Sequence, residues 1–315
     1  MTSALGADYK LAVVESVKRK FGEAGFVVKT IDLSKQAKDI SIRQLNEFAP
    51  DIVVSSHVVG KNLVYGFDGE IAKPYRDYYI IADYEVPFIL KSMRSEESFI
   101  VVPNEEFKQE LESIGYKPNQ LLPFGIPVSE KFHKQLDINK TLARLKLPGF
   151  DKSVPTVLVA AGAPGFVSVI KRLAFNPEIQ IIAVCGGSAK LKQRISRIAG
   201  NARIYSFGLC DNIDELMTVS HFYIGRADGL SVTEAVAKGL HLVTFKKLPL
   251  QEAANFHYLE SKGLAKSIKK MMQLEYYVAL KPDKQNKSDV LVEYSAEKIV
   301  NHALKGSSST KSKAR

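Results

Sequence analysis

Short apolar runs alternate with longer stretches of helical periodicity along most of the chain. In the first part, runs rich in β-branched and aromatic residues predict strands at residues 26–31, 51–56, 78–82, 98–102 and 121–125. Apolar positions at three- and four-residue spacing predict helices at residues 11–24, 42–48 and 105–114. We expect Asn104 to cap the last of these helices and Gly115 to end it.

A second series of the same kind follows a polar, lysine-rich connection near residues 137–152. Its strands are predicted at residues 156–161, 179–184, 203–207, 221–224 and 240–245. Helices are predicted between them at residues 190–198, 213–219 and 233–238. Continuous apolar strands that alternate with helices are typical of parallel sheets covered on both faces. The pattern therefore predicts an α/β protein with two Rossmann-like, doubly wound domains that face a cleft.

The chain length agrees with two domains, because 315 residues compare with roughly 100–200 in a usual domain. We expect an N-terminal domain over residues 1–137 and a C-terminal domain over residues 138–304. The last eleven residues, 305–315, carry four positive charges and no acidic residue. They are expected to form a basic, disordered tail.

Charge and cysteine content narrow the function classes. The net charge of +10 suits an anionic partner and suits simple solubility equally well. A nucleic-acid partner is not expected, because the chain has no tryptophan and no RNP-like or helix-turn-helix signature. Cys185 and Cys210 form neither a disulfide framework nor a metal-ligand spacing, so we expect the reducing cytoplasm and no metal site. No apolar stretch reaches the ~20 residues that span a bilayer, and the N-terminus lacks the layout of a signal peptide.

Three loops at predicted strand ends carry the candidate chemistry. Residues 162–165 read Gly-Ala-Pro-Gly, which lets backbone amides approach a phosphate, although a strand-to-helix turn needs glycine as well. Residues 225–235 lead into a helix whose N-terminus favours anions. Within them, Ser231 and Glu234 fit a capping box, and Glu234 equally suits the two hydroxyls of a ribose. In residues 249–255, a Gln-Glu pair offers hydrogen bonds to a sugar, or simply begins a helix.

The order and spacing of these motifs resemble the donor half of a GT-B glycosyltransferase. The resemblance is to the family of monogalactosyldiacylglycerol synthases and processive diacylglycerol glucosyltransferases. The matching segments are Gly208 to Cys210, Asn212 to Leu216, Ser231 to Ala235, Gly239 to Phe245 and Pro249 to Asn255. Upstream, Gly115 to Val128 is similar to the family's link between domains, and residues 162–165 are similar to its glycine loop.

The resemblance implies a donor site for a UDP-sugar. Glu234 would bind the ribose, and Arg226 would help to neutralise the diphosphate, so that neither a metal nor a cofactor is expected. The other implied donor residues are Gly162, Gly165, Ser231, Val232 and Thr233 at the diphosphate, Gln251, Glu252 and Asn255 near the sugar, and Leu209 and Cys210 at the uracil.

On the acceptor side, the resemblance implies that Asp83 is the general base, since a carboxylate can take the proton of the acceptor hydroxyl. The alternative is that Asp83 caps a turn at a strand end. Gly6, Tyr9 and His57 are the other acceptor-side positions.

Several positions depart from the family pattern. Asp228 and Leu250 stand where the family has glycine, and residues 6–9 lack the second glycine and the histidine of the family's first loop. The strand before that loop is expected to be missing, which would leave its neighbours incompletely paired. Donor binding should then be better preserved than transfer.

The function that the resemblance implies is transfer of a hexose from a UDP-sugar to diacylglycerol or a glycolipid. We expect a peripheral protein on the cytoplasmic face of the plasma membrane, docked to anionic lipid through Lys18, Arg19, Lys20 and Lys29. One alternative is a catalytically degenerate relative that binds a nucleotide sugar or a protein partner. A second is a peptidoglycan-precursor N-acetylglucosaminyltransferase, although Gln251, Glu252 and Asn255 favour the lipid branch.

Overall fold

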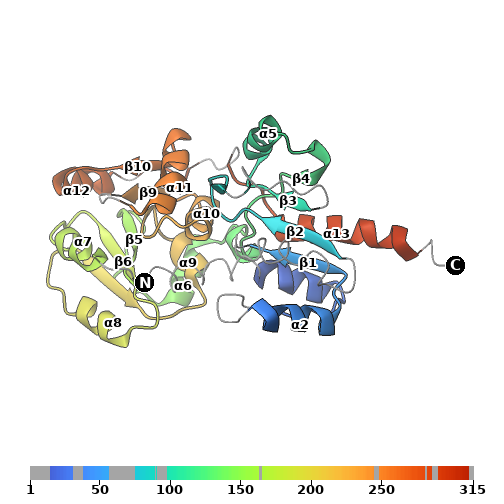
Figure 1. Ribbon diagram of the computed structural model, residues 1–315. Helices are drawn as coiled ribbons and strands as arrows, with labels where there is room; N and C mark the ends of the chain where they lie inside the picture. The colour runs from blue at the N-terminus through green and yellow to red at the C-terminus, as the bar shows by residue number, and fades with distance from the viewer. Residues whose placement is uncertain are drawn as a thin grey trace. The chain divides into compact units, whose positions relative to one another are not determined.

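The computed structural model describes residues 15–30, 38–56, 75–88, 90, 98–162, 165–244, 248–280, 282–285 and 290–311. It divides the chain into two compact units (Figure 1). Unit 1 comprises Met1–Ser129 together with Asp289–Arg315, and unit 2 comprises Glu130–Ser288. The acceptor-side positions Gly6, Tyr9 and His57 lie outside the described residues.

Unit 2 is built on one parallel six-stranded sheet in the order β10-β9-β8-β5-β6-β7. The strands are β5 (Thr156–Ala160), β6 (Gln180–Val184), β7 (Arg203–Phe207), β8 (Phe222–Ile224), β9 (His241–Thr244) and β10 (Ala265–Ser267). The helices are α6 (Ile138–Leu145), α7 (Phe166–Leu173), α8 (Ala189–Ser196), α9 (Ile213–Thr218), α10 (Gly229–Ala237), α11 (Leu250–Ser261) and α12 (Met271–Ala279). Strands β5 to β9 confirm the five predicted strands of this half, and β10 is additional.

The core of unit 2 explains why these segments are strands. Val157, Ile181 and Phe222 belong to one buried cluster with residues of α7 and α12. Leu158 and Ile182 alternate with those residues along the strands and are also fully buried. Because neighbouring side chains point to opposite faces of a strand, both faces of the sheet are covered.

Unit 1 contains a shorter parallel sheet in the order β1-β2-β3-β4. Its strands are β1 (Ile52–Ser55), β2 (Arg76–Ile80), β3 (Phe99–Val101) and β4 (Leu121–Leu122). Its helices are residues 15–23, α2 (Lys38–Phe48), α5 (Glu105–Ser113) and α13 (Ser295–Lys311). As predicted, Asn104 caps α5, where its side chain accepts a hydrogen bond from the Glu106 amide at 3.1 Å, and Gly115 follows with a φ of 97°.

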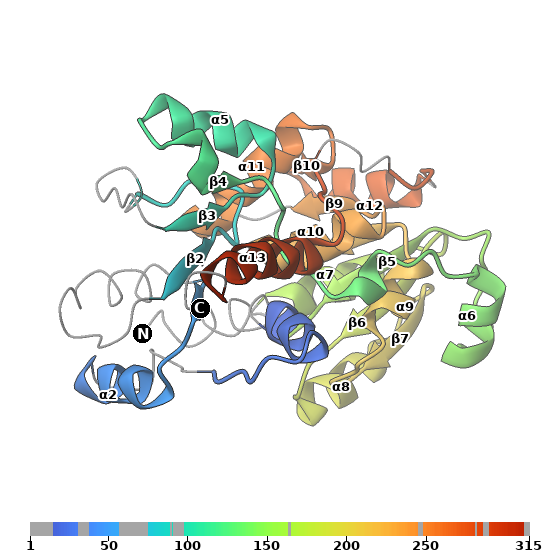
Figure 2. The same cartoon turned by 90° about the vertical axis from the view of Figure 1, so that its right-hand side faces the viewer.

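The strand predicted at residues 26–31 is wrong for its described part, since residues 26–30 form no strand. The Phe26 amide instead donates to the Phe21 carbonyl at 3.0 Å, at the end of the preceding helix, and Val27 is exposed. In Figure 2 this segment follows that helix as a plain ribbon. A β-rich sequence forms a strand only where a partner strand takes its hydrogen bonds, and none does so among the described residues.

The C-terminal segment packs on unit 1 rather than on unit 2, which differs from the expected boundary at residue 304. Ser295 Oγ donates to the Gly125 carbonyl at 2.7 Å, and His302 Nδ1 lies 2.9 Å from the Tyr78 hydroxyl. Arg76 Nη2 also donates to the Ala303 carbonyl at 2.6 Å. The helix continues to Lys311, so the prediction of a disordered tail is wrong over residues 305–311.

Candidate functional site

The strand order of unit 2 places two glycine-containing loops side by side. From β5 the next two strands in sequence, β6 and β7, are added toward one edge of the sheet. The chain then returns to the other side of β5, where β8, β9 and β10 are added toward the opposite edge. Val159 of β5 pairs with Ile224 of β8, so the loops after these two strands flank the point where the order reverses. In open α/β sheets this is where ligands bind, beyond the carboxyl ends of the strands.

Glycine is required in the loop after β8. A Cβ at Gly225 would lie 2.9 Å from Ala160 Cβ of β5 and would also collide with the Tyr223 hydroxyl. That hydroxyl donates to the Arg226 carbonyl at 3.2 Å, which fixes the turn. The loop after β5 is less crowded, because a Cβ at Gly162 would only touch the Cys185 carbonyl at 3.7 Å.

Helix α11 holds the loop after β8 through two buried side chains. Glu252 accepts hydrogen bonds from Arg226 Nε at 3.0 Å and from the Ala227 amide at 3.1 Å. Asn255, which is fully buried, donates from Nδ2 to the Ala227 carbonyl at 2.9 Å. Both residues were implied sugar contacts, and here both fix the loop, whereas Gln251 is exposed.

The N-terminus of α10 differs from the predicted capping box. The helix begins at Gly229 and its N-cap is Asp228, whose Oδ1 accepts from the Ser231 amide at 3.0 Å. Ser231 Oγ donates to Oδ2 of the same carboxylate at 2.9 Å. The capping box of Ser231 and Glu234 is therefore wrong, because Asp228, an equally good cap, precedes it.

This cap also occupies amides that were implied to hold a diphosphate. The Ser231 amide bonds the Asp228 side chain, and the Val232 amide donates to the Asp228 carbonyl at 3.1 Å. Thr233 is buried, and its hydroxyl donates to the Gly229 carbonyl at 2.5 Å. Burial raises the pKa of the Asp228 carboxyl, while its hydrogen bonds with Ser231 oppose the rise.

Glu234 stands one turn further along α10. Its side chain is half-buried, and among the described residues its carboxylate makes no hydrogen bond or ion pair. Burial raises the pKa of Glu234 to about 8, with a further contribution from the Asp228 charge and an opposing one from Lys131. A half-buried carboxylate with unused acceptor capacity can bind a ligand that brings hydroxyl donors.

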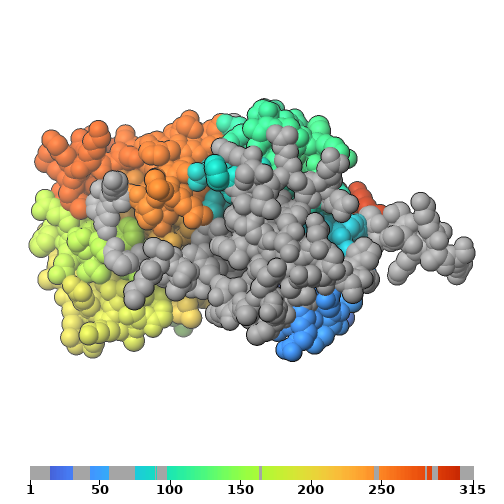
Figure 3. Space-filling model, viewed as in Figure 1, coloured from blue at the N-terminus to red at the C-terminus, as the bar shows by residue number. Residues whose placement is uncertain are grey.

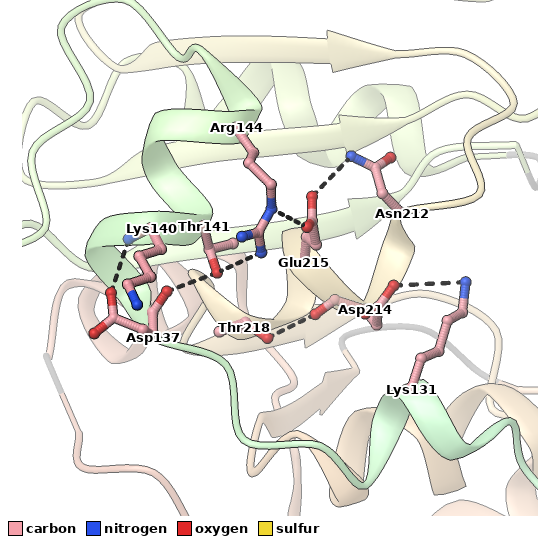
Figure 4. A network of polar contacts seen from close by, with 9 residues as sticks. All are labelled: Lys131, Asp137, Lys140, Thr141, Arg144, Asn212, Asp214, Glu215 and Thr218. Atoms are coloured by element: carbon pink, nitrogen blue, oxygen red, sulfur yellow. Dashed lines mark hydrogen bonds and ion pairs between the residues drawn. The ribbon is translucent and has the colours of Figure 1, made fainter.

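Beside Glu234, a network of polar side chains fixes α9 (Figure 4). Lys131 Nζ lies 3.5 Å from Asp214 Oδ1 and also donates to the Asp211 carbonyl. Arg144 of α6 donates to Glu215 Oε1 at 2.6 Å. Sequence reasoning missed Lys131 because it lies outside every motif, between the link that ends at Val128 and the lysine-rich connection near residues 137–152.

The same network positions the turn after β7. Leu209 is exposed and Cys210 is half-buried, directly before α9. Burial raises the pKa of the Cys210 thiol. That the backbone at Leu209 and Cys210 reads the uracil stays a prediction.

In unit 1, Asp83 follows β2 at the carboxyl end of the strand and is buried. Burial raises the pKa of Tyr79, and the charge of Asp83 adds to this effect. Phe88, five residues later, is exposed. The position at a parallel strand's carboxyl end suits a functional carboxylate, and it suits a turn cap as well.

Solved structures share the fold of this chain. The chain is similar over its full length to the calicheamicin glycosyltransferase CalG4, with a TM-score of 0.56, 12% identity and 86% of that chain covered. It is similar over 89% of its length to Anabaena Alr3699/HepE in complex with UDP-glucose, with a TM-score of 0.52, 13% identity and 85% of that chain covered. The fold is GT-B.

Sequence comparisons show which GT-B proteins this chain resembles. Residues 34–128 match the family model for monogalactosyldiacylglycerol (MGDG) synthase. A processive diacylglycerol β-glucosyltransferase of Bacillus pumilus is 30% identical over 215 residues, which are 63% of this chain and 55% of the relative. The chain is thus similar to MGDG synthases over residues 34–128 and to these glucosyltransferases over 63% of its length. It spans about half the length of the curated relatives it matches.

Proposed function

We propose that this chain is a glycosyltransferase that moves a hexose from a UDP-sugar to a hydroxyl of diacylglycerol or a glycolipid. The observation that carries the proposal is the placement of Glu234 next to the reversal point of a GT-B sheet, with unused acceptor capacity. The homologous diacylglycerol glucosyltransferases support the choice of acceptor.

In the proposed donor site, Glu234 accepts hydrogen bonds from the two ribose hydroxyls. The diphosphate lies near Gly162 and Gly165, where the backbone can approach closely. Arg226 offsets part of its charge, since the guanidinium is positively charged. Gln251 is the proposed sugar contact, because its neighbour Glu252 already bonds Arg226 and Ala227.

In the proposed transfer step, the acceptor oxygen forms a bond to the anomeric carbon as the bond to the UDP oxygen breaks. The acceptor hydroxyl proton goes to the carboxylate of Asp83, and UDP leaves as the anion. Among the described residues, no group of three or more His, Cys, Asp or Glu side chains is arranged to hold a metal ion.

The acceptor implies work at a membrane, and we propose the cytoplasmic face of the plasma membrane. The structure describes no helix that is long and apolar enough to span a bilayer. Ion pairs within the helix of residues 15–23 neutralise part of its basic charge. Lys18 pairs with Glu15 at 3.1 Å, and Lys20 pairs with Glu23 at 2.9 Å. These pairs reduce the electrostatic attraction that we expected from this helix.

A UDP-release assay with diacylglycerol vesicles tests the proposal. Wild-type protein should release UDP only when a UDP-hexose and diacylglycerol are both present. Asp83→Asn should abolish release and leave UDP affinity unchanged. UDP binding without release by the wild type would instead support the degenerate relative, and absence of UDP binding would refute the proposal.

A further inference from the structure

Helix α12 presents an apolar face to solvent, although its opposite face belongs to the core of unit 2. Leu274 and Val278 are fully buried in that core. Met272 and Tyr276, in contrast, are 71% and 72% exposed, and Leu280 directly after the helix is exposed too. Residues four apart lie on one side of a helix, so these three side chains form a stripe. Single exposed apolar residues are ordinary, whereas a contiguous set indicates an interaction site.

The end of α7 extends this stripe. Asn176 Nδ2 donates to the Glu275 carbonyl at 3.3 Å, and Arg172 pairs with the Glu275 carboxylate. These contacts bring Phe175, which is 63% exposed, beside α12. Phe175, Met272, Tyr276 and Leu280 are called the α12 patch below.

Lysines lie next to α12, since Lys270 is its N-cap and Lys266 lies over the Tyr277 ring. Residues 261–280 contain four lysines, at positions 262, 266, 269 and 270, and one acidic residue, Glu275. All four lysines are exposed. Lys266 Nζ lies 4.9 Å from the ring centre of Tyr277, which ties its charge to α12. In Figure 3 the orange-red atoms of this segment lie at the surface.

The nearby acids do not cancel this positive charge. Glu275 is already paired with Arg172. Glu260, at the end of α11, accepts from the Ser267 amide at 2.7 Å and from the Ser267 hydroxyl at 3.3 Å. Its carboxylate charge offsets one of the four lysines, which leaves an excess of positive charge. The patch therefore combines exposed apolar side chains with a positive surround.

We propose that the α12 patch and its lysines dock on the headgroup region of an anionic lipid bilayer. Tyrosine and lysine suit such an interface, because an apolar body enters the acyl boundary while the polar end stays in water. Lysines near an anionic surface add electrostatic attraction. A second copy of this chain is a poorer occupant, because a two-fold interface would bring the lysines of both copies together. The inference rests on the proposed function only for the lipid nature of the acceptor.

Flotation with vesicles tests this surface in the full chain. The protein should bind vesicles of phosphatidylcholine with phosphatidylglycerol, and binding should weaken with added salt. Lys269→Gln/Lys270→Gln should reduce partitioning about 25-fold, because each lysine contributes roughly fivefold at an anionic surface. Met272→Ser/Tyr276→Ser should also reduce it, because the inserted apolar area is lost.

Matched variants in the same unit provide the controls. Arg194→Gln/Arg197→Gln, on α8 and directly after it, removes the same charge away from any apolar stripe, and Ile138→Ser on α6 removes an exposed apolar residue. Both should bind vesicles as the wild type does. UDP affinity should be unchanged in every variant. A loss of UDP binding would therefore reveal a failure of the proposed donor site, separately from a failure of vesicle binding. Equal vesicle binding by α12 and control variants would overturn the inference, as would a concentration-dependent dimer that only the α12 variants abolish.

Discussion

The two units share a parallel α/β architecture, yet they are stabilised by contacts of very different range. In unit 2 the loop after β8 is fixed by Glu252 and Asn255, which lie fewer than thirty positions further along the chain. In unit 1 the side chains of β2 instead meet α13, and Tyr78 and His302 are 224 positions apart. Unit 2 is continuous in sequence, whereas the sheet of unit 1 depends on the returning C-terminal helix. The loop after β8 is thus fixed by residues that are close in sequence, whereas the sheet of unit 1 is held by a segment that is distant in sequence.

The largest expected effect concerns α13. Ile299 is fully buried in this helix, and Ile299→Ala should cost about 2–5 kcal/mol of stability by opening a cavity. Denaturant unfolding should show the loss in the transition of unit 1, with that of unit 2 little changed. Exposed Lys298→Ala is the control, with an expected change within about 0.5 kcal/mol. Equal destabilisation of both units would contradict the claim that α13 stabilises unit 1 and not unit 2.

Gly225→Ala should have the next largest effect, this time in unit 2. The new methyl group would collide with the Tyr223 hydroxyl and Ala160 Cβ, and such overpacking typically costs about 1–3 kcal/mol. Thermal unfolding checks this, with Gly187→Ala as the control because nothing lies within 4 Å of its Cβ position. Equal melting temperatures for the two alanine variants would contradict the close approach of β5 and β8 at Gly225.

Asn255→Ala tests the hold of α11 on the loop. The Ala227 carbonyl would lose its side-chain donor, and an unsatisfied buried acceptor costs about 1–3 kcal/mol. Chemical denaturation measures the change, and Gln251→Ala, on the exposed side of the same helix, should be nearly neutral. A neutral Asn255→Ala would mean that the loop is fixed by other contacts.

A further expected effect is a pH dependence of the stability of unit 2. Because burial raises the pKa of Glu234 from its ordinary value of 4.5 to about 8 in the folded state, the folded state retains a proton that the unfolded state releases. Its contribution to stability is complete below pH 4.5 and is lost as the pH rises to about 8. Glu234→Gln should therefore gain stability relative to wild type between these values. A constant difference across that range would contradict the raised pKa.

The sequence pattern predicted unit 2 better than unit 1 for a physical reason. The strands β5 to β9 have apolar side chains on both faces, a signal that each segment carries by itself. The segment 26–30 carries a similar signal, but a strand also needs a partner, which its own sequence does not specify. The packing of α13 on unit 1 depends on contacts such as Tyr78 with His302, which leave no local pattern.

The candidate site shows the same limit. The motifs located the loops after β5 and β8, because glycine and turn chemistry are local properties. They did not show that Glu252 bonds Arg226 and Ala227, or that Asp228 displaces Ser231 as the cap. Those outcomes depend on which acceptor reaches a given amide, and only the folded arrangement decides this.

Calorimetric titration with UDP tests the central claim most directly. At a pH above 8, where the Glu234 side chain is charged, the wild type should bind UDP and Glu234→Ala should weaken binding roughly tenfold or more, since a hydrogen bond to a charged group contributes about 1.5–3 kcal/mol. Its melting temperature should not fall, because the helix is capped by Asp228. The matched Glu178→Ala, at an exposed position before β6, should bind UDP as the wild type does. Unchanged affinity in Glu234→Ala, or no UDP binding by the wild type, would contradict the account.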